Sequence, residues 1–225
     1  MHIEPGIVTG TKIIVSYATA AGSAACALRL AIRSLSQQHA LELVGKSAIA
    51  TGLVFTFFEV FPHHAVGVSE VHLILGSTLF LLFGAAPSAF GLAIGLLIQG
   101  FFFAPFDLPQ YGMNVTTLLV PLFAVKALAS RIVPEHTPYV DLEYRQVLAL
   151  SIGYQGGIVA WVAFWAFYGH GLSADTLSSI AVFGGAYMLV IVVEPLVDLA
   201  MLAAAKAFDG LRESSLVEHR LYGAA

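Results

Sequence analysis

Charged residues are scarce in this sequence, and their scarcity determines its broad class. They make up 11% of the 225 residues, whereas hydrophobic residues make up 58% and the mean hydropathy is +0.85. Soluble domains carry about a quarter charged residues. The composition therefore predicts an integral membrane protein, in which the net charge of −4 is divided between the two sides of a lipid bilayer.

Cysteine is almost absent as well, because Cys26 is the single one in the chain. One cysteine excludes an internal disulfide framework and any metal site built from several cysteines. We expect Cys26 to be a small buried side chain. The few lysines and arginines form no large basic patch, so we expect no nucleic-acid partner.

Several sequence motifs of enzymes are missing. There is no glycine-rich phosphate loop followed by lysine, so the chain itself should not hydrolyse ATP. Neither a His-Glu-x-x-His pair nor a Gly-x-Ser-x-Gly elbow is present. Residues 1–10 also lack the basic start of a signal peptide, so we expect the first apolar helix to be retained.

Long apolar runs are what the sequence does contain. A membrane-spanning helix needs about 20 mostly apolar residues. Seven stretches are candidates, the second to fourth of them short: 11–35, 46–61, 71–86, 88–103, 115–132, 147–168 and 177–205. No repeat or linker divides the chain. We expect an all-α, polytopic membrane helix bundle of about seven transmembrane helices, forming a single domain over residues 1–225.

The loop charges predict the orientation of this bundle, because cytoplasmic loops gather lysine and arginine. Apart from Lys12, the basic residues fall on one side: Arg29, Arg33, Lys46, Lys126, Arg131, Arg145, Lys206, Arg212 and Arg220. This places the N-terminus outside and the C-terminus in the cytoplasm. Five histidines then lie on the outer side: His2, His63, His64, His72 and His170.

The opening residues, Met1 and His2, offer three nitrogens at fixed spacing. These are the α-amine of Met1, the amide of His2 and the imidazole of His2, which can form fused chelate rings around one divalent cation. A planar nitrogen set suits Ni(II) and Cu(II), and Co(II) somewhat less. A fourth donor would be needed to complete a square-planar site. The alternative is that these residues form a solvated chain end.

His72 is the candidate for that fourth donor. It opens the third apolar stretch, where an ionisable side chain needs a partner to offset its desolvation. The alternative is an interfacial histidine that hydrogen-bonds to a loop carbonyl. A metal ion shared with His2 would favour ligation.

Further polar residues on the same side are expected to assist rather than to bind the ion directly. His63 and His64 are adjacent, so at most one faces a common centre, and both are candidates for guiding the ion. Acidic side chains there would attract a cation, and the amides of Gln110 and Asn114 could orient a ligand through hydrogen bonds. The acidic residues are Glu59, Glu70 and Asp107. Glu194 and Asp198, in the last span, mark an ion route or pair with Arg145, and the sequence does not choose between these roles.

The motifs at this end of the chain resemble those of a known family. The opening Met1-His2-Ile3-Glu4-Pro5-Gly6, the run Ser69-Glu70-Val71-His72-Leu73, the glycine-rich third and fourth spans and Gly112-Met113-Asn114-Val115 resemble the cobalt/nickel substrate-binding components of energy-coupling-factor ABC transporters. These are the M-type proteins of cobalamin biosynthesis and nickel uptake. The resemblance covers roughly the first two-thirds of the chain.

The resemblance implies a helix bundle with an additional N-terminal helix, whose leading residues fold back into the interior. There the Met1 amine, the His2 amide and imidazole and the His72 imidazole would coordinate Co(II) or Ni(II), the transported substrate. It also implies a membrane coupling subunit, cytoplasmic ATPase subunits, sometimes a small accessory membrane protein, and a location in the cell (inner) membrane. The Glu4-Pro5 turn departs from the family pattern.

Three functions therefore stay open. The preferred interpretation is a transport component, without enzymatic activity of its own, that captures cobalt or nickel from outside. The second is an intramembrane metal-dependent enzyme with Glu59 or Glu70 as general base. The third is a vitamin-binding membrane component in which the histidines are incidental.

Overall fold

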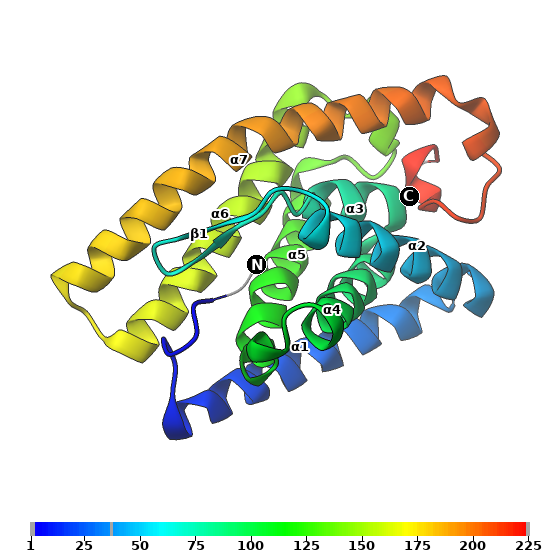
Figure 1. Ribbon diagram of the computed structural model, residues 1–225. Helices are drawn as coiled ribbons and strands as arrows, with labels where there is room; N and C mark the ends of the chain where they lie inside the picture. Colours follow the sequence, from blue (N-terminus) through cyan, green and yellow to red (C-terminus); the bar gives the residue numbers. More distant parts are fainter. Residues whose placement is uncertain (1–2, 37, 224–225) are drawn as a thin grey trace.

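The computed structural model describes residues 3–36 and 38–223, which form a bundle of helices with one small antiparallel sheet (Figure 1). The predicted class, a helical membrane bundle, is confirmed. The described helices are α1 (Ile13–Ser34), α2 (Ala40–Glu59), α3 (Gly76–Phe83), α4 (Ala85–Phe102), α5 (Tyr111–Ile132), α6 (Tyr144–His170) and α7 (Ala174–Ala207). The strands are β1 (His64–Val66) and β2 (Ser69–Val71). Short 3-10 turns are η1 (Gly10–Lys12), η2 (Pro105–Gln110), η3 (Tyr139–Asp141), η4 (Asp209–Leu211) and η5 (His219–Leu221).

The third apolar stretch differs from the prediction. Within the described ranges, six helices are long and apolar enough to cross a membrane, and α3 is not among them. The stretch 71–86, predicted as one continuous span, is divided into the end of β2, the non-helical residues 72–75 and the eight-residue α3. Four non-helical residues and eight helical ones extend at most roughly 25 Å, close to the ~30 Å of bilayer hydrocarbon. This broken segment therefore takes the place of the continuous third span that the sequence predicts.

A broken segment is tolerated at this place because protein surrounds it. All eight residues of α3 are buried. Irregular backbone at membrane depth is allowed only where protein or a cavity, and not lipid, encloses it. Leu75, directly before α3, has a φ of 55°, in the left-handed region that a non-glycine residue rarely adopts. The break is thus held by the packing around α3.

The hairpin of β1 and β2 precedes this segment. Its register pairs His64 with Val71 and Val66 with Ser69, which leaves a two-residue turn. Gly67 begins the turn with a φ of +63°, and a Cβ there would lie 2.3 Å from the carbonyl oxygen of Ser179 on α7. Only glycine allows both this backbone shape and this approach. The hairpin is therefore docked against α7.

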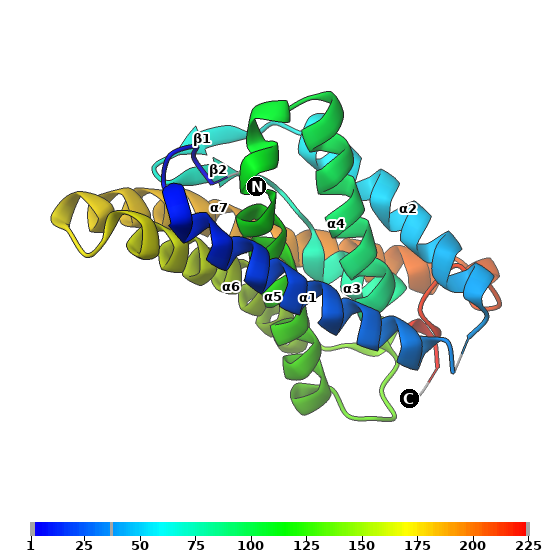
Figure 2. The same ribbon diagram turned by 90° about the horizontal axis from the view of Figure 1, so that it is seen from below.

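Helices that follow one another in the chain pack side by side, α5 on α6 and α6 on α7, whereas α2 packs on α4. The first helix, α1, lies on the outside of the bundle against α4 and α5, on the side nearest the viewer in Figure 2. Its buried positions form a narrow row of small residues, with Ser23, Ala27 and Ala31 four residues apart. Cys26 lies outside this row and is exposed, so the expectation that it is buried was wrong.

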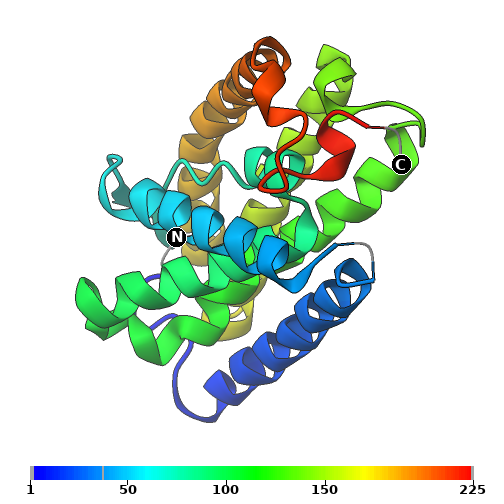
Figure 3. The same ribbon diagram turned by 90° about the vertical axis from the view of Figure 1, so that its right-hand side faces the viewer.

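The two ends of the bundle are chemically different. At one end, the Lys12 ammonium donates to the carbonyls of Tyr168 and Gly169, which joins the start of α1 to the end of α6. At the opposite end, the segment that follows α7, red in Figure 3, returns to the bundle, and the Glu218 amide donates to the Leu82 carbonyl at the end of α3. We call these the hairpin end and the C-terminal end. Apart from Lys12, the lysines and arginines of the described helices and loops lie toward the C-terminal end.

Candidate metal centre

β2 delivers His72 to the interior at the hairpin end. The side chain follows the last residue of the strand, and 1% of the residue is exposed. The edge of the Phe58 ring packs against the imidazole, with 5.3 Å between the ring centroids and an angle of 81°. An ionisable ring is thus held against an apolar wall, as the sequence predicts for a residue opening an apolar segment.

Two of the residues predicted to assist lie directly beside this imidazole. Side chains two residues apart on an extended chain share a face, and Glu70 Oε2 lies 2.9 Å from His72 Nε2. The His63 ring stacks on the His72 ring at 4.9 Å and 8°. His64 is exposed and pairs through its backbone with Val71. Of the adjacent histidines, His63 is therefore the one that meets His72.

The first described residues run along the same hairpin. Ile3 forms an antiparallel bridge with Ser69 and is fully buried, and the Glu4 amide donates to the Val68 carbonyl at 3.2 Å. The Ile3 amide donates to Asn114 Oδ1 at 2.9 Å, and Asn114 is itself buried on α5. The segment, dark blue in Figure 2, is thus attached both to the hairpin and to a membrane helix. Met1 and His2, two of the three predicted ligands, lie outside the described residues.

Acidic and amide groups from η2 complete the surroundings. Asp107 is buried, and its carboxylate lies near enough to Glu70 and Glu4 to be repelled by both. Gln110 is also buried, and its Oε1 accepts no hydrogen bond from the part of the chain that is described. Repelling carboxylates favour the presence of a cation between or beside them. Glu59, the other carboxylate considered, is the last residue of α2.

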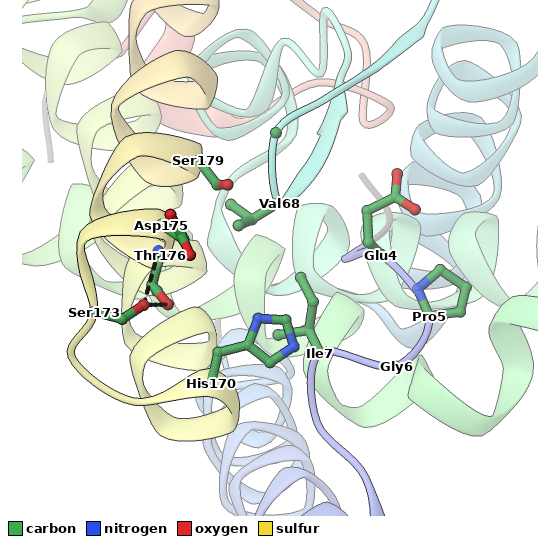
Figure 4. Close-up of a pocket in the computed structure, with 11 residues that line it drawn as sticks. Glu4, Pro5, Gly6, Ile7, Val68, His170, Ser173, Asp175, Thr176 and Ser179 are labelled. Carbon is green, nitrogen blue, oxygen red and sulfur yellow. Dashed lines mark hydrogen bonds between the residues drawn. The ribbon is translucent and has the colours of Figure 1, made fainter.

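A cavity of about 520 Å³ opens beside this region (Figure 4). Its lining combines the first described segment, the hairpin turn and the connection between α6 and α7. Polar lining groups include Glu4, His170 and Asp175. The N-terminal segment itself lines the cavity, so the cavity gives water and ions access to that segment.

Ligand number limits what the described residues can hold by themselves. In residues 3–36 and 38–223, no group of three or more His, Cys, Asp or Glu side chains is placed to hold a metal ion. The hydrogen-bonded pair of His72 and Glu70 supplies two candidate donors. A tightly bound transition metal takes four to six donors, so a site at His72 requires further ones.

The sequence did not show two of these contacts. The pairing of Ile3 with Asn114 joins residues 111 positions apart, and no local pattern announces it. The stacking of His63 on His72 depends on the hairpin, whose three-residue strands are too short to show a clear alternation. The spacing of Glu70 and His72, two residues apart and therefore on one face of an extended chain, was the one available signal.

The deep acidic pair lies elsewhere. Glu194 and Asp198 are both fully buried on α7. Arg145, one of the partners considered for them, instead pairs with Glu143 at the exposed start of α6. The interpretation of the pair as partners of Arg145 was therefore wrong.

Comparisons with known proteins agree with this architecture. Residues 2–210 match the family described as the cobalt uptake substrate-specific transmembrane region, CbiM. Two solved structures are similar in fold, a transition metal transporter with a TM-score of 0.67 and a truncated transition metal transporter with a TM-score of 0.61. Each is 19% identical in sequence; the matches cover 95% and 92% of this chain, and 97% of each of those chains. No curated protein sequence matches the chain.

A family match over most of the chain identifies its membership, whereas structures of such low identity support the fold alone. The match extends from the N-terminal segment through α7 and so includes every helix described above. The chain belongs to the family of cobalt uptake substrate-specific transmembrane regions and is a multi-pass membrane component of transition-metal uptake.

Proposed function

We propose that this chain is the substrate-capturing component of an energy-coupling-factor importer for divalent cobalt, with nickel as the second ion. The ion is bound by four nitrogens: the Met1 amine, the His2 amide, the His2 imidazole and the His72 imidazole. Affinity order alone places nickel above cobalt for such donors. The family description, which names cobalt, supports cobalt as the first choice.

The anchoring of Ile3 is the observation that carries this proposal. Ile3 pairs with Ser69 in an antiparallel sense. The residues that precede Ile3 therefore run in the same direction as the residues that follow Ser69, toward His72. Two residues extend at most roughly 7 Å. That reach, together with the length of the His2 side chain, suffices to bring the chain start to the imidazole three residues beyond Ser69.

The neighbouring groups then have defined tasks. Glu70 Oε2 lies within hydrogen-bond distance of His72 Nε2, so an ion must displace Glu70 or use the other ring nitrogen. His63 stacks on the ring and limits its rotation, and Asn114 fixes the Ile3 amide. Held in this way, the nitrogens replace the ion's water with little further ordering, which favours binding.

The remaining functions belong to partner proteins. A membrane coupling subunit and cytoplasmic ATPase subunits would supply the energy, and a small accessory membrane protein would assist capture. The concentration of lysine and arginine at the C-terminal end supports a cytoplasmic location for that end and an outer location for the hairpin end, in the cell (inner) membrane. His64 and Gln110 would line the route by which the ion arrives.

Calorimetric titration of the purified chain with cobalt and nickel tests the four-nitrogen site. We expect His72→Ala to weaken binding at least tenfold, or about 1.4 kcal/mol. The matched control is His136→Ala, because His136 is an exposed histidine in the loop between α5 and α6, away from His72; this variant should bind both ions as the unaltered chain does. One residue added before Met1, or acetylation of its amine, should also abolish binding.

Unchanged cobalt and nickel affinity in the extended chain would exclude the amine as a ligand. Retained binding in the His72→Ala variant would exclude the imidazole. The enzyme alternative, with Glu59 or Glu70 as base, predicts lost turnover with retained metal, and the vitamin-binding alternative predicts no effect of either change on the protein's ligand.

A further inference from the structure

A second polar cluster lies deep in the bundle, at the first turn of α3. Glu194 and Asp198 are one turn apart on α7, and both have 0% exposure. They belong to the row of buried α7 residues that includes Tyr187 and Leu202. Two carboxylates at this depth carry a large desolvation penalty, so they need compensation.

Hydrogen bonds from two other helices reach the pair. The Ser77 hydroxyl lies 2.7 Å from Asp198 Oδ2 and 3.2 Å from Glu194 Oε1. Thr78 donates to Asp198, and the Gln155 amide of α6 donates to Glu194. One hydroxyl has a single proton, so the Ser77 hydroxyl cannot donate to both carboxylates at once, but the Ser77 amide also donates to Glu194. The cluster therefore has more acceptors than donors.

Two further buried polar atoms belong to side chains that contact this cluster or the residue beside it. Gln155 is fully buried; its amide nitrogen bonds Glu194, while its Oε1 accepts no hydrogen bond from the residues described. The phenol end of Tyr154 passes over Gly76, the residue before Ser77, where a Cβ would lie 2.0 Å from Tyr154 Cζ. The Tyr154 hydroxyl is buried and also has no hydrogen-bond partner in the described part of the chain. Buried polar atoms of this kind are typically satisfied by water or an ion.

No base balances the two acids. Within the described ranges, the ion pairs of lysine and arginine are Arg145 with Glu143 and Lys206 with Asp141, and neither involves α7's acidic pair. Two adjacent carboxylates without a cationic side chain need a cation or protons. The oxygen atoms present are the donors that divalent cations such as Mn(II) and Mg(II) accept.

The cluster also lies in line with the outer site. The Tyr187 hydroxyl donates to the His72 carbonyl oxygen at 3.4 Å. Glu194 is seven residues further along the same helix, which places it roughly 10 Å deeper along α7. α3 begins between the two levels, and its first turn supplies Ser77 and Thr78. Interrupted helices in membrane transporters commonly form ion sites at such breaks.

We propose that Glu194, Asp198 and Gln155 Oε1 form a second, oxygen-lined cation site, at which the imported divalent ion rests after leaving the nitrogen donors at the hairpin end. This inference rests on the proposed transport function and adds the inner stage of the route. The hydroxyl groups of Ser77 and Thr78 orient the carboxylates, and the Tyr154 hydroxyl is a further oxygen donor. Loss of the pair should therefore block passage of the ion without affecting its capture.

A purely structural role gives a different expectation. In that case the acids only cap the first turn of α3, and their anionic oxygens are satisfied by the helix amides and hydroxyls. The cluster would then bind no ion. Substitution by the matching amide would lower stability and alter capture and passage together, because α3 follows directly on the His72 segment.

Mn(II), which prefers oxygen donors, is the direct probe. In the His72→Ala variant, titration followed by electron paramagnetic resonance should show about one bound Mn(II) per chain. Adding Glu194→Gln or Asp198→Asn should weaken that binding at least tenfold. The control is Glu213→Gln, which removes an exposed carboxylate at the C-terminal end and should leave Mn(II) binding unchanged.

Transport provides the second measurement. With His72 intact, the Glu194→Gln and Asp198→Asn chains should bind cobalt at the outer site with unchanged affinity, whereas cobalt uptake by the assembled importer should fall at least tenfold. Absence of bound Mn(II) in the His72→Ala chain, or uptake at the unaltered rate in both amide variants, would overturn the inner site. Failure of the outer site has a separate signature, which is cobalt affinity that does not depend on His72.

Discussion

Removal of the Asn114 amide tests how the anchored N-terminal segment contributes to metal binding. Asn114 Oδ1 accepts the Ile3 amide at 2.9 Å, and both residues are buried. Leucine has the same branching and number of heavy atoms but no acceptor, so Asn114→Leu leaves a buried amide unsatisfied. Such a loss costs about 1–3 kcal/mol. When this cost destabilises the N-terminal segment in the arrangement that binds the ion, cobalt affinity decreases by a factor of roughly 5 to 150.

Two measurements separate this effect from general damage. Calorimetric titration with cobalt reports the affinity, and hydrogen exchange of the N-terminal peptide should become faster in Asn114→Leu. Thr117→Val is the matched control, because Thr117 is buried one turn further along α5 and its hydroxyl donates to the Met113 carbonyl. That variant should retain the affinity of the unaltered chain. Unchanged affinity and unchanged exchange in Asn114→Leu would refute the role assigned to this contact.

Two predictions concern stability at opposite ends of the bundle. Gly67→Ala should destabilise the protein by about 2 kcal/mol or more, because Gly67 has a left-handed φ and lies close to Ser179. The control is Gly210→Ala, which has open space around the added methyl group. In thermal unfolding this control should be nearly neutral. Burial raises the pKa of Glu218 above its ordinary value of 4.5, so the carboxyl holds its proton more tightly in the folded state. The contribution of this carboxyl to the free energy of unfolding is greatest below pH 4.5 and is lost as pH rises through the higher folded-state pKa. Glu218→Gln should remove this pH dependence from the thermal stability, and an identical pH profile in both chains would contradict it.

The long helices could be predicted from the sequence because a bilayer leaves the backbone little choice. Any stretch that crosses lipid must satisfy its amides internally, so an apolar run of sufficient length becomes a helix. The stretch 71–86 is also apolar, yet it is broken, and the break is tolerated because protein buries nearly all of the stretch. Hydropathy measures the preference for leaving water and does not distinguish lipid from a protein interior. The left-handed Leu75 and the short α3 therefore had no counterpart in the pattern.

The site shows the same division between local and distant information. His72 could be singled out because an imidazole at the edge of an apolar run is unusual. Its neighbours depend on which segments meet: Glu70 lies beside it through strand geometry, and His63 through the turn at Gly67. The attachment of Ile3 to Asn114 links the chain start to α5, and only the folded structure reveals it.

The two proposed sites differ in donor type, and this difference bears on release. Four nitrogens suit a late transition metal and hold it tightly, so an ion captured there would leave slowly if the apolar core were the only alternative. Oxygen donors at Glu194 and Asp198 bind such ions less tightly but spare the ion complete dehydration. A route that passes from stronger to weaker donors permits both capture at low concentration and departure toward the cytoplasm, provided that a partner supplies the energy to open the first site. On this reasoning the break before α3 is functional, because one short segment carries His72 at its outer end and presents Ser77 and Thr78 to the inner carboxylates. A movement of that segment would therefore change both sites together.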